Sequence, residues 1–218
     1  MPPIVDRYEL GPIGTNCYVV RADRGASEAV VVDPSGDAAQ LRLDLARAGA
    51  RCVAILVTHC HSDHLVGVAD LAEGTGAPVH MSAEEAPVLA APDQWFPEFR
   101  LVPVRPYAVD VELAGDETLE LAGITFQTLR VPGHSPAHLA FHADGALFSG
   151  DVLFEGSVGR VDLPGAGWAT LLESIRALVE RYPPETTVYP GHGPPTTLGA
   201  ELARNPFLAE LRAELHNA

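Results

Sequence analysis

The sequence predicts an α/β fold, and two observations lead to that prediction. Short runs rich in valine, isoleucine and leucine, typical of buried strands, alternate in the N-terminal half with segments whose apolar residues recur at helical spacing. The order strand, helix, strand, helix is typical of a sheet covered by helices. With 218 residues and 47% hydrophobic content, the chain can bury a sizeable core, and we expect one domain over residues 1–218.

In the N-terminal half, the apolar pattern predicts both strands and helices. Asp37 is a suitable N-cap for the first helix, and Gly49 is placed to end it. The expected elements are a hairpin over residues 8–22, a strand over 28–34, a helix over 37–49, a buried strand over 52–59 and a helix over 65–74.

After residue 82, a short helix leads into a proline-rich stretch that is expected to form a loop up to about residue 108. Strand patterns then return, separated by turn residues, and one long amphipathic helix precedes the last strand. A charged helical tail closes the chain. The expected ranges are strands over 109–114, 118–122, 124–132, 138–145 and 146–151, a helix over 167–182 and a strand over 186–190.

Charge and cysteine content exclude several classes of protein. The net charge is −15 and all 14 basic residues are arginines, so we expect no nucleic-acid partner. No apolar run is long enough to span a membrane, and residues 1–10 do not resemble a secretory signal. The three cysteines form no C-x-x-C pair, which fits a reducing compartment. We therefore expect a cytoplasmic protein.

The strongest local signal is THCHSDH at residues 58–64, directly after a predicted buried strand. His59 and His61 are two apart on extended backbone, so both imidazoles project to the same side. Asp63 and His64 follow where the chain turns. A solvated loop that happens to contain histidines is the alternative, but such a pattern arises by chance in only about one chain in a thousand.

Three further loops carry the same residue types, and each follows a predicted strand. They are PGH ending at His134, SGD ending at Asp151 and PGH ending at His192. One such tripeptide alone would be weak evidence, since ordinary turns contain the same residues. Because loops at strand ends collect ligands in sheet folds, we expect the four segments to converge.

Imidazole and carboxylate together suit first-row divalent ions, and five histidines with two aspartates are enough ligands for two of them. We expect zinc first, with iron or manganese as alternatives. The absence of a thiolate from the set disfavours a purely structural zinc site. Two ions a few ångströms apart can activate a water molecule and polarise a carbonyl or phosphoryl oxygen, so the set indicates hydrolysis.

The sequence resembles the metallo-β-lactamase superfamily over nearly the whole chain. The motifs that carry the resemblance are GTNCYVV, VVDPSGD, THCHSDH, GHSPAH, FSGD and YPGHGP. The resemblance implies a four-layer αββα sandwich with the site at one edge of the paired sheets. It also implies ligand roles. His59, His61 and His134 would bind the first ion, Asp63, His64 and His192 the second, Asp151 would bridge both, and Asp63 would orient the attacking water.

Within the superfamily, the sequence is most similar to short hydrolases related to glyoxalase II, which hydrolyses the thioester S-D-lactoylglutathione. The resemblance implies a small-molecule thioester substrate and places Arg160, in SVGRVDLPG, against a carboxylate of the thiol carrier. The alternative is a surface arginine paired with Asp162. The carrier stays open, because only residues 194–218 follow the last motif, where glyoxalase II has a helical domain.

Two rival functions remain. A persulfide dioxygenase of the same fold would use a single iron held by two histidines and an aspartate, although that family usually has a cysteine at the position of His138. A non-catalytic metal-binding module is the other rival. A β-lactamase and a nucleic-acid-processing member are disfavoured by the missing signal and the acidic charge. The oligomeric state is not predicted.

Residues beside the motifs receive simpler interpretations. Cys60 lies between two ligands on extended backbone, so its side chain is expected to point away from theirs and pack. His138 is expected to support the site by hydrogen bonding rather than to bind a metal. His80, His142 and His216 belong to no motif and are expected to be ordinary, partly exposed histidines.

Overall fold

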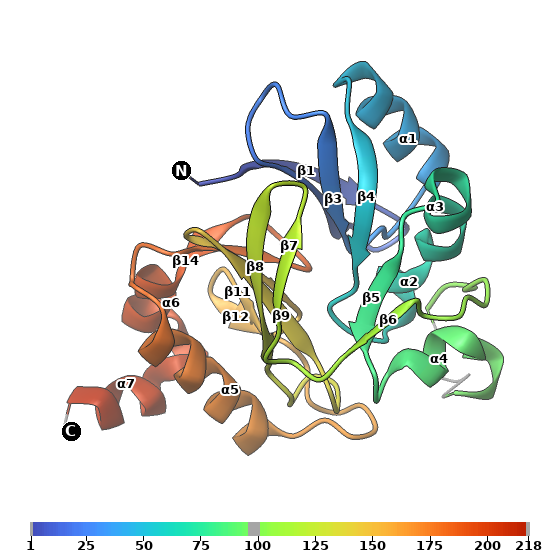
Figure 1. Ribbon diagram of the computed structural model, residues 1–218. Helices are drawn as coiled ribbons and strands as arrows, with labels where there is room; N and C mark the ends of the chain where they lie inside the picture. Colours follow the sequence, from blue (N-terminus) through green and yellow to red (C-terminus); the bar gives the residue numbers. More distant parts are fainter. Residues whose placement is uncertain (1, 96–100, 217–218) are drawn as a thin grey trace.

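A computed structural model describes residues 2–95 and 101–216 of the chain. Two six-stranded sheets pack face to face, and helices cover the outer face of each (Figure 1). This is the four-layer αββα sandwich that the resemblance implied. Within the described residues, no helix is long and apolar enough to cross a membrane.

The first sheet has the strand order β1-β2-β3-β4-β5-β6. Its first three strands are antiparallel, and β3 to β6 run parallel. Parallel neighbours need crossover connections, which helices provide here. The strands are β1 (Ile4–Leu10), β2 (Thr15–Arg21), β3 (Glu28–Val32), β4 (Arg51–Leu56), β5 (Val79–Ser82) and β6 (Val111–Leu113); the helices are α1 (Ala38–Arg47), α2 (Ser62–Leu65), α3 (Val68–Thr75) and α4 (Ala86–Ala90).

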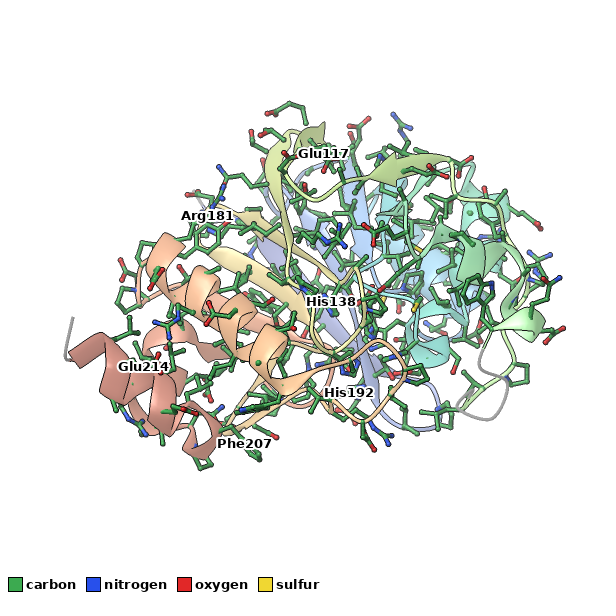
Figure 2. All side chains as sticks on the ribbon, turned by 90° about the horizontal axis from the view of Figure 1, so that it is seen from below. Glu117, His138, Arg181, His192, Phe207 and Glu214 are labelled. Atoms are coloured by element: carbon green, nitrogen blue, oxygen red, sulfur yellow. The ribbon has the colours of Figure 1, made fainter. Side chains whose placement is uncertain are left out.

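The second sheet has the order β14-β13-β10-β9-β8-β7. All neighbours are antiparallel except β10 and β13, and the chain between these two contains α5. Helices α5 to α7 lie on the outer side of this sheet (Figure 2). The elements are β7 (Thr118–Leu121), β8 (Ile124–Arg130), β9 (Leu139–Ala143), β10 (Ala146–Gly150), β13 (Thr187–Pro190), β14 (Thr196–Thr197), α5 (Trp168–Arg181), α6 (Leu198–Arg204), α7 (Ala209–His216) and a separate hairpin of β11 (Leu153–Phe154) and β12 (Ser157–Val158).

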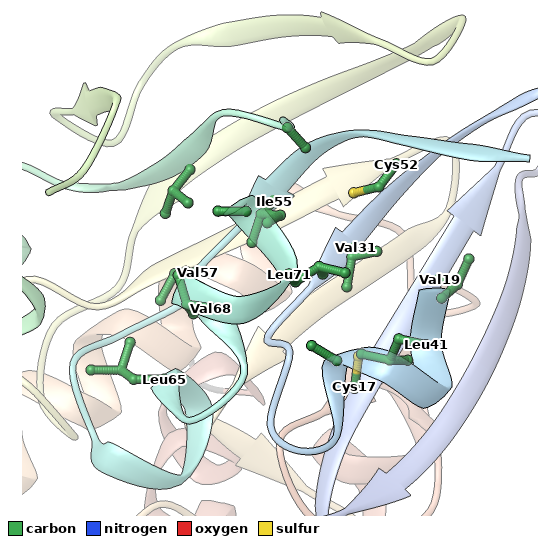
Figure 3. Packing of buried hydrophobic residues seen from close by; sticks show 14 of the residues in the cluster. Cys17, Val19, Val31, Leu41, Cys52, Ile55, Val57, Leu65, Val68 and Leu71 are labelled. Carbon is green, nitrogen blue, oxygen red and sulfur yellow. The ribbon is translucent and has the colours of Figure 1, made fainter. Parts of the chain in front are cut away.

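Three apolar clusters hold the layers together. One lies between the two sheets, and one lies between each sheet and its helices. The three consecutive valines of β3 contribute to two of these clusters. Val31 packs toward α1 and α3 (Figure 3), while Val30 and Val32 pack between the sheets. A strand buried on both faces reads as a continuous apolar run.

Most expected elements are present. Asp37 caps α1 by accepting the N–H groups of Ala39 and Gln40, and α1 ends just before Gly49. The expected helix over 65–74 is instead two helices, broken at Gly67. The Gly67 N–H donates to Pro34 O at 2.8 Å, and a Cβ at Gly67 would lie 2.6 Å from that same oxygen. Glycine is therefore required where this helix passes the end of β3.

Strand β5 was not predicted, because its four residues are all buried and show no alternation. The expectation that His80 is partly exposed is wrong, because His80 lies on this missed strand and is buried. His142 is half-buried, as expected, and stacks on the ring of Tyr182.

Candidate metal centre

Seven histidines and aspartates meet at one edge of the sandwich, where several strands end. Two come from the extended segment after β4, two from α2, and one each from the loops after β8, β10 and β13. Of these, His192 is labelled in Figure 2 and lies in the lower middle of that view. The seven are His59, His61, Asp63, His64, His134, Asp151 and His192, which is the set that the sequence predicted.

The first group consists of His59, His61 and His134, whose ligand atoms all lie within 4.8 Å of one another. Within it, Nε2 of His59 lies 3.0 Å from Nδ1 of His61. His61 has extended backbone, with φ −72° and ψ 141°, so the two imidazoles converge as the two-residue spacing predicted. Three nitrogen atoms thus face one point.

The second group consists of Asp63, His64 and His192, again within 4.8 Å. Asp63 Oδ2 lies 3.4 Å from Nε2 of His64 and 3.3 Å from Nε2 of His192. Asp151 lies between the groups. Its Oδ1 is 3.4 Å from His64 Nε2, and its Oδ2 is 3.5 Å from both His134 Nε2 and His192 Nε2. One carboxylate therefore faces ligands of both groups.

The separations of 3.3–3.5 Å around Asp63 and Asp151 fit metal ligands better than hydrogen-bonded partners. Ligand atoms at about 2.0–2.1 Å from a tetrahedral zinc ion lie roughly 3.3 Å from one another, close to the values above. Three of the buried atoms, Nε2 of His64, Nε2 of His134 and Oδ1 of Asp151, have no hydrogen-bond partner. Buried polar atoms without partners are costly and uncommon. The residues present thus fit one or two divalent ions.

A chain of hydrogen bonds fixes which nitrogen of His59 and His64 faces the site. The hydroxyl of Thr58 donates its single hydrogen to Asp33 Oδ2 at 2.7 Å, so its oxygen must accept from Nδ1 of His59 at 3.0 Å. Nδ1 of His64 donates to the same Asp33 oxygen at 2.9 Å. In His59 this leaves Nε2 with a lone pair directed at the site. In His64 it leaves Nε2 as the nitrogen that faces Asp63 and Asp151.

Other contacts hold the remaining groups. Nδ1 of His134 donates to the backbone carbonyl of Arg160 at 2.9 Å, and Thr15 donates its hydroxyl hydrogen to Asp63 at 2.8 Å. The backbone N–H of Asp151 donates to Nε2 of His138 at 3.1 Å. His138 therefore positions Asp151 by a hydrogen bond, the supporting role that the sequence predicted.

The electrostatic environment favours neutral imidazoles at the first group and ionised carboxylates beside the second. Burial lowers the pKa of His59 far below its usual range and that of His61 to about 3. Burial opposes ionisation of Asp63, but His64 and the contacts with His192 and Thr15 outweigh it and lower the pKa to about 2. Ligands must be deprotonated to bind a metal, and these three already are. At the second group, Asp63 and Asp151 outweigh burial, raise the pKa of His64 well above its usual range and raise that of His192 to about 9, so an ion that binds there displaces protons from both imidazoles.

Cys60 points away from the ligands, as predicted. Its half-buried side chain packs against the cluster under α1 and α3, and burial raises the pKa of its thiol. Glu85, at the start of α4, is the neighbouring acid. It is buried, accepts the N–H of Ala137 at 2.8 Å, and its burial raises the pKa of its carboxyl.

A cavity of about 560 Å³ opens above the ligands, and Arg160 lies on its wall with His61 and His192. The Arg160 side chain is 57% exposed and bonds Asp162 twice, through Nε and Nη2, at 2.7 Å each. The structure thus contains the ion pair with Asp162 that the interpretation of Arg160 as a surface residue expects, and it also places Arg160 on the wall of the cavity above the ligands.

Sequence reasoning assigned no role to Asp33 or Thr15, nor to the Arg160 carbonyl. For Asp33 a signal was present: a carboxylate directly after the buried valines of β3, within the VVDPSGD segment. Its φ of +48° is uncommon outside glycine. Thr15 contacts Asp63, which lies 48 residues further along the chain, and the Arg160 carbonyl contacts His134, which lies 26 residues before it. No local sequence pattern reveals either contact.

We expect Asp33→Asn to weaken metal binding by roughly 10–100-fold, the usual effect of losing a residue that orients metal ligands. An amide oxygen is a weaker acceptor than a carboxylate, and the amide nitrogen cannot accept from Thr58 or His64 at all. A competition titration against a chelator measures the loss. Asp37→Asn is the matched control, because asparagine also caps helices well. Equal metal affinity in the two variants would remove Asp33 from the support of the site.

Comparison with known proteins places these features in context. A family model described as the metallo-beta-lactamase superfamily matches residues 10–192. The hydroxyacylglutathione hydrolase GloC of Haemophilus influenzae is 33% identical over 198 residues, which cover 88% of this chain and 92% of that protein.

Two solved structures are similar over nearly the whole chain. The crystal structure of the BLEG-1 B3 metallo-beta-lactamase has a TM-score of 0.84 and 36% identity, covering 94% of this chain and 100% of that one. The crystal structure of TTHA1623 in a di-iron-bound form has a TM-score of 0.74 and 39% identity, with the same coverage. The match to the family model spans all seven residues of the metal-ligand set.

Proposed function

The chain belongs to the metallo-beta-lactamase superfamily, and from this premise we propose that it is a two-metal hydrolase of small-molecule thioesters, such as S-D-lactoylglutathione or a related acyl-thiol. The position of Asp151 supports the binding of two ions, because its carboxylate lies about equally far from ligands of both groups. The similarity to GloC over most of both chains supports the thioester.

In this proposal, His59, His61 and His134 hold the first ion, Asp63, His64 and His192 hold the second, and Asp151 binds both. Zinc is the first choice, and iron is the main alternative because TTHA1623 was solved with two irons. When bound, such ions lower the pKa of water toward neutrality and polarise the carbonyl of the substrate.

The chain's own residues orient the reactants. The hydroxyl of Thr15 fixes the Asp63 carboxylate at 2.8 Å, and an ionised carboxylate so held can accept a hydrogen bond from the attacking water. Water adds to the acyl carbon, the carbon–sulfur bond breaks, and the products are a carboxylic acid and a thiol. Positioning of this kind contributes to the rate because it removes the entropy cost of bringing the reactants together.

A substrate panel with metal analysis tests the proposal. We expect release of thiol from lactoylglutathione or a related thioester by metal-loaded protein, loss of that activity with a chelator, and little turnover of a β-lactam. Bound iron with oxygen uptake on glutathione persulfide, and no thiol release, would instead identify a persulfide dioxygenase. No turnover of any of these compounds would favour a non-catalytic metal-binding module.

We also propose that Arg160 binds a carboxylate of the thiol carrier through its Nη1 group, since the pair with Asp162 uses Nε and Nη2. Arg160→Ala should raise KM for an anionic thioester about tenfold, or about 1.4 kcal/mol, with little change in kcat or metal content. Steady-state kinetics measure this.

Arg181→Ala removes the same charge from the end of α5, away from His192 (Figure 2), and should leave KM unchanged. An unchanged KM in Arg160→Ala would exclude Arg160 from substrate binding. An equal loss on a neutral thioester would show that its role is structural.

A further inference from the structure

A second cavity, of about 190 Å³, lies beside the cavity above the ligands. The two share His61, Ser62 and Leu163 as wall residues. A group bound in the smaller cavity therefore sits next to His61 of the first metal-ligand group. The cavity belongs to the neighbourhood of the reacting centre, although none of the proposed chemistry uses it.

The wall of the smaller cavity is mainly apolar. Leu65 of α2, Val88 of α4 and Val104 contribute to it. Leu65, labelled in Figure 3, and Val104 also belong to the apolar cluster under α1 and α3. Glu84 forms an ion pair with Arg130. One oxygen of Glu85 accepts the Ala137 N–H, and the other is buried without a hydrogen-bond partner. Because burial raises the pKa of Glu85, this carboxyl adds at most one polar contact to a cavity whose wall is otherwise mainly apolar.

Its size defines the group that fits. An apolar cavity of about 150 Å³ is large enough to bind benzene, so 190 Å³ accommodates a phenyl ring or a chain of about six carbons. A group of two or three carbons with a hydroxyl, such as lactoyl, would leave most of this volume unfilled. Apolar burial is favourable in proportion to area, so the larger apolar group binds more tightly.

The arrangement of the two cavities indicates which half of a thioester enters each. The carbonyl carbon carries two substituents, the acyl chain and the thiol carrier. Arg160 lines only the larger cavity, and that is where an anionic carrier finds a positive charge. With the carbonyl at the ligands, the acyl chain is then directed past His61 into the smaller cavity.

We infer that the smaller cavity is the acyl-binding pocket and that the enzyme prefers thioesters of apolar acyl groups of about six carbons, aliphatic or aromatic. This inference rests on the proposed thioesterase function and names its substrate class. Val88 is the pocket residue that sets the acyl-chain length. It is half-buried on α4, and it lines the smaller cavity but not the larger one.

The test compares acyl chains of two, six and eight carbons on one anionic thiol, with metal-loaded protein. We expect wild-type kcat/KM to be at least tenfold higher for six carbons than for two, about 1.4 kcal/mol. Val88→Phe should abolish this preference with little change for the two-carbon substrate, and Val88→Ala should shift it toward eight carbons. Ala90→Phe, on the exposed side of the same helix, should change neither.

Metal content and melting temperature of each variant confirm that the fold and the site persist. Absence of a chain-length preference in wild type, or an equal loss of all substrates in Val88→Phe, would overturn the inference. The inference would also be overturned if kcat/KM, measured with one acyl group, depended in this way on the length of the thiol. The pocket would then hold the thiol half of the substrate.

A binding measurement separates failure of this inference from failure of the proposed function. The probe is a ketone analogue in which a methylene replaces the thioester sulfur, with acyl chains of two or six carbons, measured by calorimetry. Tenfold tighter binding of the six-carbon analogue that Val88→Phe removes would support the pocket even if no thioester is hydrolysed. Hydrolysis without any such preference would support the thioesterase and contradict the pocket.

Discussion

Replacing Asp151 with alanine is expected to lower kcat/KM for a thioester by roughly 1,000-fold or more and to reduce metal binding at both groups. The carboxylate faces His64 with one oxygen and His134 and His192 with the other, so its removal would take a ligand from each of the two proposed ions. It also removes the negative charge that offsets repulsion between two cations. A bound ion contributes several kcal/mol to catalysis, and each 1.36 kcal/mol is a factor of ten.

Elemental analysis together with steady-state kinetics measures both effects. Asp23→Ala, in the exposed turn between β2 and β3, is the control for loss of an acidic charge and should behave as wild type. Full metal occupancy with near-normal turnover in Asp151→Ala would contradict the bridging role.

Gly191→Ala should have the next largest effect, a loss of about 100-fold in kcat/KM with weakened metal binding. A Cβ at this position would lie 2.0 Å from Asp151 Oδ1 and 2.7 Å from Cε1 of His64, so both ligands must move. The backbone cannot retreat easily, because the Gly191 N–H donates to Gly150 O at 2.9 Å and its carbonyl accepts the Asn16 N–H at 2.7 Å. Small displacements of catalytic groups can cost this much.

Gly193→Ala provides the control for this substitution. Gly193 has φ of +75° and nothing within 4 Å of the added carbon, so alanine costs about 1–2 kcal/mol of stability through the left-handed backbone alone. Thermal unfolding should show that cost while activity is retained. If Gly193→Ala lost as much activity as Gly191→Ala, crowding of the ligands would not be the cause.

The candidate metal ligands could be identified in the sequence because their signal is local. His59 and His61 share a face of an extended segment through their spacing alone, and the tripeptides ending at His134, Asp151 and His192 follow recognisable strands. The strands that bring those loops together could be predicted as well, because β4 contains a continuous apolar run and β8 and β13 alternate between more and less buried residues. The convergence of the four segments then follows from the sheet edge they share.

The supporting contacts could not be predicted in the same way. Asp33 reaches Thr58 and His64 across 25 and 31 residues, and its role depends on how β3 and β4 pair. Strand β5 is too short and too uniformly buried to separate from a helix by periodicity. The smaller cavity lies between α2, α4 and later loops, so its shape exists only after these segments pack.

If two ions act together in thioester hydrolysis, a metal titration shows it. Metal-free protein is titrated with a divalent ion, zinc first and then iron or manganese, while thiol release from a thioester is followed. We expect the rate of thiol release to rise until two ions are bound per chain and then to stay constant. Full activity at one ion per chain, or no thiol release at any loading, would contradict it.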